Sequence, residues 1–327
     1  MNIGKLTNEK LNELVLSKLK HVRKEVVSDV GIGIDCAEIV PGNNHIVLSC
    51  DPITATSSGI GRLSVNVCCN DAVAAGAEPI GLMVTLLIPP SATEEEISAV
   101  VDEMVETAST VNVDIIGGHT EVTDSVTRIV TCTTVIAKRG GRKISSAMMR
   151  PGDAIIMTKT AGLEGTSIIV SSIPEVRDFL TKSECIEALG FDKDTSVVKE
   201  GLFAAKHGAH AMHDVTEGGI MGAVWEMSEA SGCSISIDKS AIPIHPVTRK
   251  VCEHFSIDPL RLVSSGCLLI ACQNGTDMLR WLRAIHVEAN IIGYANDETS
   301  SSRFVRTTDG STIEPPEADE LYKVIKF

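Results

Sequence analysis

The chain has 327 residues and a formal net charge of −14, from 29 Lys and Arg against 43 Asp and Glu. Such a charge repels polyanions, so we expect neither a nucleic-acid-binding nor an anionic-membrane-binding protein. Only 3% of the residues are aromatic, which argues against base-stacking platforms and predicts an aliphatic core. At roughly 150 residues per domain, this length predicts two domains.

The cysteines and the N-terminal segment predict the compartment. The ten cysteines lie mostly in apolar segments and form no CxxC pair. We interpret them as small buried thiols in a reducing compartment rather than as a zinc or redox site. The N-terminal segment is charged from Lys5 onward, and no segment approaches the roughly 18 apolar residues of a membrane span. These features predict a cytoplasmic protein without membrane contact.

The first half of the chain alternates predicted helices and strands. Leucines at helical spacing predict an amphipathic helix over residues 7–20. A Gly-rich extended segment follows, with Gly31 and Gly33 allowing a close approach of the backbone to a neighbour, and then a strand that ends at Asp51. Further predicted elements are a small-residue helix over residues 60–77, a helix with Thr93 as its N-cap, and strands over residues 113–117 and 126–137.

The basic, Gly-rich run at residues 138–153 ends in a Pro-Gly-Asp turn and predicts a domain boundary. We therefore expect domains at residues 1–145 and 146–327. The segments AIIMTKTAGLEGTSIIV and HAMHDVTEGGIMGAV each predict a strand, a Gly-containing loop and a helix. Both patterns place backbone N–H groups at a helix N-terminus, where anions are favoured.

Four aspartates occupy comparable contexts next to apolar sequence: Asp35, Asp51, Asp71 and Asp214. An unpartnered buried carboxylate costs several kcal/mol, so each is expected to have a base, a helix cap or a cation beside it. Any one of them alone is compatible with a cap or a surface position. Together with the Gly-rich loops, they suggest an oxygen-preferring ion such as Mg²⁺ that holds phosphates.

The segment GGHTE at residues 117–121 is a second candidate site. Its glycines Gly117 and Gly118 allow the backbone to approach a ligand, while His119 and Thr120 offer polar side chains. A plain turn is the alternative interpretation. Neither a Walker loop nor a complete dinucleotide fingerprint occurs in the chain.

Three histidines, His207, His210 and His213, fall three residues apart. No carboxylate-rich helical face accompanies them, so we do not interpret them as zinc ligands.

The order of motifs resembles a known family. The segments GIDCAEI, SCD, NVCCNDAVAAGAEP, GGHTEV, PGD, HDVTEGGI and SSGCLLIA, between about residues 28 and 295, are similar to the aminoimidazole ribonucleotide (AIR) synthase superfamily. This superfamily also includes selenophosphate synthetase, thiamine monophosphate kinase and the hydrogenase expression/formation protein. The resemblance implies a two-domain PurM-like α/β (α+β) fold. In that fold the N-terminal domain forms a dimeric β-barrel with a second chain, and the C-terminal domain is also α/β.

The resemblance also implies roles for individual residues. Metal ligands for Mg²⁺ on ATP would be Asp35, Asp51, Asp71 and Asp214. Nucleotide-contacting residues would be Asn70, Gly117, Gly118, His119, Thr120, Thr216, Gly218 and Gly219. The second substrate would lie near Gly162 and Gly165. No nucleophile is evident, and the candidates for a catalytic role are Asp51, Asp71 and His119.

The implied activity is transfer of the ATP γ-phosphoryl group to an amide, thioamide or similar acceptor, carried by a small molecule or a partner protein. The chain is most similar to AIR synthase related proteins close to the hydrogenase maturation member. It departs from that member because it ends DELYKVIKF, with no cysteine after Cys272. His119 also stands where several relatives have aspartate. The alternative function is therefore a non-catalytic dimeric ATP-binding module or maturation partner. A structural protein without a nucleotide site would need all the carboxylates to be caps or surface residues.

Overall fold

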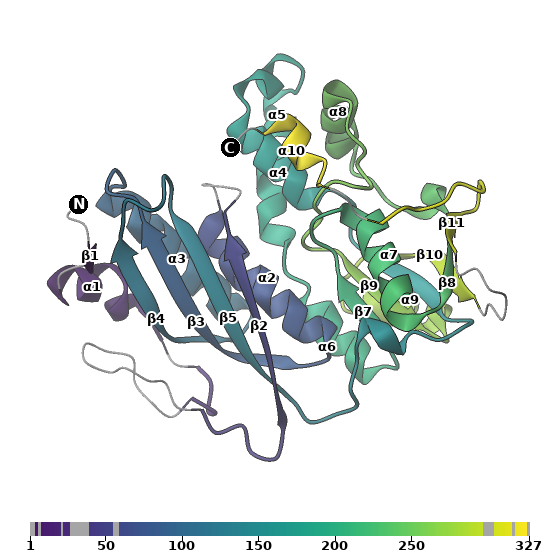
Figure 1. Cartoon of the computed structure of the whole chain (residues 1–327), viewed down its shortest axis with the longest axis horizontal. Coiled ribbons are helices and arrows are strands. Elements are labelled where there is room, and N and C mark those ends of the chain that lie inside the picture. The colour runs from purple at the N-terminus through teal and green to yellow at the C-terminus, as the bar shows by residue number, and fades with distance from the viewer. Residues whose placement is uncertain are drawn as a thin grey trace. The chain divides into compact units, whose positions relative to one another are not determined.

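The computed structural model describes residues 4–5, 8–20, 22–26, 39–54, 59–296, 304–315 and 318–325. The chain forms two compact units, one of Met1–Val73 with Ala77–Gly141 and the other of Ala74–Gly76 with Arg142–Phe327. Each unit contains its own β-sheet (Figure 1). Asp35 and the glycines Gly31 and Gly33 lie outside the described residues.

The first unit has a five-stranded sheet with the order β1-β4-β3-β5-β2. The strands are β1 (Gly4–Lys5), β2 (His45–Ile53), β3 (Glu78–Ile88), β4 (Asp114–Val122) and β5 (Val130–Arg139). The helices are α1 (Asn8–Leu14), the 3₁₀ turn η1 (Leu16–Lys18), α2 (Ile60–Ala74) and α3 (Glu94–Thr110). β3 and β4 are parallel and connected through α3, whereas the other neighbouring strands are antiparallel.

One face of this sheet is covered and the other is open within the unit. Figure 1 shows α2 and α3 on the same face of the sheet. Burial alternates along β5 in the two-residue period of a strand that packs on one side only. On the edge strand β2 the alternate residues Ile46 and Leu48 are exposed, at 42% and 62%. The open face therefore carries large apolar side chains.

The sequence signals for α3 are confirmed. Thr93 is its N-cap and forms a capping box with Glu96, so each residue's side chain accepts from the other's backbone N–H. The predicted helix over residues 7–20 is wrong in its length, because α1 ends at Leu14 and a 3₁₀ turn follows. The small-residue helix ends at Ala74, ahead of Gly76 with its positive φ of 69°.

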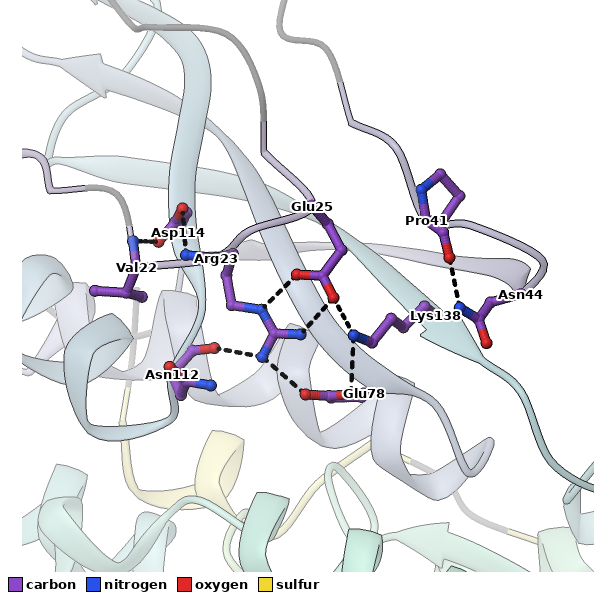
Figure 2. A network of polar contacts seen from close by, with 9 residues as sticks. All are labelled: Val22, Arg23, Glu25, Pro41, Asn44, Glu78, Asn112, Asp114 and Lys138. Carbon is purple, nitrogen blue, oxygen red and sulfur yellow. Dashed lines mark hydrogen bonds and ion pairs between the residues drawn. The ribbon is translucent and has the colours of Figure 1, made fainter.

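A buried ion-pair network anchors the N-terminal segment to the sheet (Figure 2). Arg23 Nη1 lies 2.8 Å from Glu78 Oε1 on β3, and Arg23 Nε lies 3.3 Å from Glu25 Oε2. Lys138 on β5 pairs with Glu25 and with Glu78. The Asp114 carboxylate of β4 accepts the backbone N–H of Arg23 over 3.1 Å.

The same segment also pairs with residues 39–40. Val26 forms an antiparallel bridge with Ile39, and the Val40 N–H donates to the Glu25 carbonyl over 2.7 Å. The residues on both sides of the stretch that contains Asp35 are therefore fixed to each other.

The second unit has a six-stranded sheet with the order β11-β8-β10-β6-β9-β7. The strands are β6 (Ala154–Thr158), β7 (Ala211–Asp214), β8 (Ser234–Ile237), β9 (Leu268–Cys272), β10 (Ala289–Asn296) and β11 (Val305–Thr307). The α-helices are α4 (Leu163–Ser172), α5 (Lys182–Leu189), α6 (Val198–Lys206), α7 (Gly219–Ser231), α8 (Pro246–Phe255), α9 (Gly275–Ala284) and α10 (Leu321–Val324). The 3₁₀ turns are η2 (Ser146–Met148), η3 (Pro174–Asp178), η4 (Gly190–Asp194) and η5 (Lys239–Ala241).

Two apolar clusters hold the second unit together. One joins the central strands to α7, and β6 and β9 are buried along their whole length. The other joins α4, α5 and α8 to the C-terminal residues Leu321 and Ile325. The predicted strand–loop–helix order is confirmed for β6 with α4 and for β7 with α7. The short strand β11 follows β10 in the chain and pairs with β8 in a parallel arrangement.

Candidate active site

Two of the predicted metal ligands lie on facing elements of the first unit. Asp51 is on β2, Asp71 is near the end of α2, and both are half-buried. The Ser49 hydroxyl donates to Asp71 Oδ2, and the Cys68 thiol donates to Asp51 Oδ2 over 3.2 Å. Ser49 and Asp51 are alternate residues of β2, so they point to the same side of the strand. Cys68 and Asp71 are three residues apart in α2, so they lie on the same side of the helix. These two contacts therefore place both carboxylates where β2 and α2 face each other.

The chemistry of this pair suits a hard cation. Mg²⁺ at phosphate sites is commonly bound by one or two carboxylates together with substrate phosphates. Burial and the Asp51 charge raise the pKa of Cys68, so this residue remains a thiol and donates rather than acting as a soft ligand. Asn70 beside Asp71 is buried, with 1% exposure. In the described ranges no group of three or more His, Cys, Asp or Glu side chains is arranged to hold a metal.

His119, the third candidate for a catalytic role, lies on the other face of the same sheet. Asp51 is in register with Thr133, Thr133 with Val84, and Val84 with Gly118. Residues directly opposite each other point to the same side, so Gly118 shares the Asp51 side and its neighbour His119 does not. The strand order also separates β4 from β2 by three strand spacings, roughly 14 Å. One chain therefore does not bring His119 to the Asp51 carboxylate.

The GGHT segment forms part of β4 rather than a loop. His119 Nε2 lies 3.1 Å from Glu121 Oε2, and both side chains are exposed. Gly118 has a φ of 148°, and a Cβ there would lie 1.8 Å from the Val84 carbonyl oxygen. The close approach of β3 therefore requires glycine at this position, whatever else the segment binds. Thr120 is half-buried on the same strand.

In the second unit the predicted phosphate loop leads into α7. Asp214 ends β7 and is 5% exposed, while Thr216 is half-buried. Gly218 is the N-cap of α7 and Gly219 is its first residue. A Cβ on Gly219 would lie 2.7 Å from the Leu260 carbonyl oxygen, and φ is +60°. Packing thus explains this glycine independently of any ligand.

The C-terminal segment contacts this loop through Asp319. Its Oδ2 accepts the Gly218 N–H over 2.7 Å, and its Oδ1 accepts the N–H groups of Val263 and Leu321 over 3.2 and 2.8 Å. Burial raises the pKa of Asp319, although these three hydrogen bonds oppose the shift. The Tyr322 hydroxyl donates to Glu217 Oε1 over 2.5 Å. Reading the sequence did not single out Asp319 or Tyr322, because no local motif surrounds them.

The two predicted substrate-contacting glycines lie at the N-terminus of α4, where Gly162 is the N-cap and Gly165 is in the first turn. The Gly162 N–H donates to Ser264 Oγ over 2.7 Å, and the Gly165 N–H donates to the Val263 carbonyl over 3.1 Å. Between them, Glu164 is nine-tenths buried and accepts hydrogen bonds from Ser265. Burial raises the pKa of Glu164 to about 7.

Lys159 is engaged inside the second unit. Its Nζ lies 2.9 Å from Glu200 Oε1 and donates to the carbonyl groups of Asp194, Ser196 and Gly266. The Glu200 side chain is 3% exposed. This lysine therefore connects three loops rather than standing in solvent.

The three spaced histidines have separate partners. Their ring nitrogens pair as His207 with the Phe203 carbonyl, His210 with Asp153 at 2.8 Å, and His213 with Glu226 at 2.9 Å. They do not converge on a common point.

Comparisons with known proteins agree with the motif order. The families described as AIR synthase related protein, N-terminal and C-terminal domain, match residues 33–138 and 150–306. The chain is 30% identical to a putative hydrogenase expression/formation protein of Methanocaldococcus jannaschii, over 98% of this chain and 97% of that protein. It is 29% identical to the carbamoyl dehydratase HypE of Cupriavidus necator, over 71% of this chain and 67% of that protein.

A solved structure of the hydrogenase maturation protein HypE in complex with ATP has the same fold. Its TM-score is 0.80 with 20% identity, over 98% of this chain and 97% of that chain. Two α/β units with these motifs define a PurM-like fold. The chain belongs to the AIR synthase related protein family, and hydrogenase expression/formation proteins are among its relatives. The predicted family and the PurM-like α/β fold are thereby confirmed, and the dimeric β-barrel stays a prediction. No helix in the described part of the chain has the length and apolarity to cross a membrane.

Proposed function

We propose that this protein is an ATP- and Mg²⁺-dependent enzyme that transfers the γ-phosphoryl group of ATP to an amide, thioamide or similar acceptor. The facing carboxylates Asp51 and Asp71 carry this proposal. Two relatives support it: one is named a carbamoyl dehydratase, and another was solved with ATP.

In the first unit we assign Asp51 and Asp71 as metal ligands. Ser49 and Cys68 each donate to one oxygen of these carboxylates and so fix their orientation. Bound Mg²⁺ and ATP would supply the phosphoryl group and neutralise its charge, which is where most of the catalysis in phosphoryl transfer arises. The protein would then need only to position ATP and the acceptor for the transfer, and no nucleophilic side chain would be required.

The remaining roles follow the family resemblance. We propose Asp35 and Asp214 as further metal ligands. The proposed nucleotide contacts are Asn70, Gly117, Gly118, His119, Thr120, Thr216, Gly218 and Gly219. Gly162 and Gly165 are proposed to lie near the acceptor, and residues 1–145 and 146–327 are the proposed domains.

We further propose a cytoplasmic homodimer. The open face of the first sheet presents Ile46 and Leu48 to solvent, and a second copy would bury them. A dimer through this face would place His119 at the interface, since it lies on the same side of the sheet as these residues. The nine described cysteines are free thiols, which fits a reducing compartment.

Calorimetry with a non-hydrolysable ATP analogue, with and without Mg²⁺, tests the metal site. The wild type should bind saturably with Mg²⁺, and Asp71→Asn should weaken binding at least tenfold. Asp124→Asn is the matched control, because Asp124 is an exposed carboxylate of the same unit. Equal binding by wild type and Asp71→Asn, or binding that ignores Mg²⁺, would refute the assignment. Nucleotide binding without ADP formation for any amide acceptor would favour the non-catalytic module.

A further inference from the structure

Four polar groups of the second unit interact electrostatically near the N-termini of α4 and α7. They are Glu164, Glu217, Asp319 and Tyr322, and they come from three separate segments. The Glu217 and Asp319 charges both act on Glu164, and all three carboxylates act on the Tyr322 hydroxyl. The group runs from the surface, where Glu217 and Tyr322 are exposed, to the buried Glu164.

Glu164 has unused hydrogen-bonding capacity. Its carboxyl accepts from Ser265, but its buried Oε2 has no hydrogen-bond partner among the described residues. A buried acceptor without a donor costs about 1–3 kcal/mol, and more if it is charged. The nearby Asp319 does not relieve this cost, because its carboxylate is an acceptor held by three backbone N–H groups. When Glu164 is ionised, an N–H donor at its Oε2 would relieve this cost.

We propose that Glu164 and Glu217, with Asp319 and Tyr322 beside them, form the subsite for the nitrogen end of the acceptor, a planar group with N–H donors such as a carboxamide, thioamide or amidinium. This inference rests on the proposed function, because it identifies the end of the acceptor that the second unit binds. An ionised carboxylate accepts only, so N–H donors complement Glu164 Oε2. A carboxylate at this end of the acceptor is disfavoured, because it would lie beside Glu164, whose electrostatic neighbours Glu217 and Asp319 are already acidic.

A metal ion is a weaker match than an organic group. The described ranges contain no group of three or more His, Cys, Asp or Glu side chains with metal-binding geometry, so these carboxylates do not make a cation cage. Tyr322 already donates to one Glu217 oxygen, which leaves Glu217 and Glu164 as the two acceptors for a ligand. Two acceptors match the paired N–H groups of a primary amide or amidinium.

Three probes of nearly equal shape test the subsite: acetamidinium, acetamide and acetate. Binding would be followed by ligand-observed NMR at pH 8, where Glu164 is ionised, in the full chain. Acetamidinium should bind at least tenfold more tightly than acetate, with acetamide in between. Glu164→Gln should weaken acetamidinium binding at least tenfold. Glu175→Gln, which changes an exposed carboxylate of the same unit, should leave binding unchanged.

Tyr322→Phe distinguishes a specific loss of ligand binding from a general loss of structure. Removing the hydroxyl frees Glu217 Oε1, so acetamidinium binding should be retained or strengthened. Equal binding of acetate, unchanged binding in Glu164→Gln, or displacement of the probe by K⁺ or Mg²⁺ would overturn the proposal. Binding of the ATP analogue is measured on the same samples. If the nucleotide binds and the amidinium does not, this inference fails while the proposed function stands.

Discussion

Glu164 makes the stability of the second unit depend on pH. Burial raises its pKa from the ordinary 4.5 to about 7, and the charges of Asp319 and Glu217 act in the same direction. A carboxyl group with a raised native pKa keeps its proton in the folded state after the unfolded chain has lost it. The free energy of unfolding therefore falls as the pH rises from 4.5, the ordinary pKa that Glu164 has in the unfolded chain, to about 7, its pKa in the folded state. Above that pH this contribution no longer changes. At about 1.4 kcal/mol per unit of pKa shift, the loss between pH 5 and pH 8 is about 2–3 kcal/mol.

Glu164→Gln removes this dependence, because glutamine does not titrate. The variant should gain about 2–3 kcal/mol relative to the wild type between pH 5 and pH 8. Urea unfolding followed by tryptophan fluorescence measures it, since Trp225 and Trp281 are the two tryptophans of the chain and both lie in the second unit. Glu175→Gln should show no such gain. A stability difference between Glu164→Gln and the wild type that is the same at both pH values would refute the reasoning.

Three further substitutions test the described contacts. Gly118→Ala should destabilise the first unit by about 3 kcal/mol or more, seen as a lower thermal midpoint by circular dichroism, because its Cβ would collide with the backbone of β3. Lys159→Met should cost about 3 kcal/mol in urea unfolding by leaving Glu200 buried without its cation, and adding Glu200→Gln should recover part of that loss. Burial raises the pKa of Glu25, but the hydrogen bond from Lys138 helps to bring it below its usual value. Lys138→Met should therefore cost about 2 kcal/mol at pH 7, and urea unfolding should show that this cost shrinks as the pH falls through the Glu25 pKa.

The elements with local signals were predictable from the sequence. Thr93 and Glu96 cap α3 through contacts within one turn, so their spacing alone indicates where the helix begins. The strand–loop–helix order around Gly162 and Gly218 is likewise encoded by nearby residues, because an apolar run gives way to glycine and then to a helical pattern. Local chemistry thus determines the parts of the fold that carry the motifs.

Long-range relations were not predictable in the same way. Motif order groups His119 with Asp51, but the register across three strands places them on opposite faces of the sheet. A shift of one residue in that register would reverse the result, and no local pattern fixes it. Asp319 contacts Gly218, which is about a hundred positions away in the sequence. Its partners are backbone N–H groups, which almost every residue type has, so the residue types do not indicate these contacts.

The strand order of the first unit has a consequence for its synthesis. β3, β4 and β5 are consecutive in the chain and adjacent in the sheet, so they can pair as soon as they leave the ribosome. β2 is made before all three, yet its only partner in that sheet order is β5, the last of them. The strand that carries Asp51 therefore remains unpaired while the central sheet is made, and its distant pairing is entropically the slower step. The proposed metal site of Asp51 and Asp71 is therefore complete only after this edge strand has paired with β5.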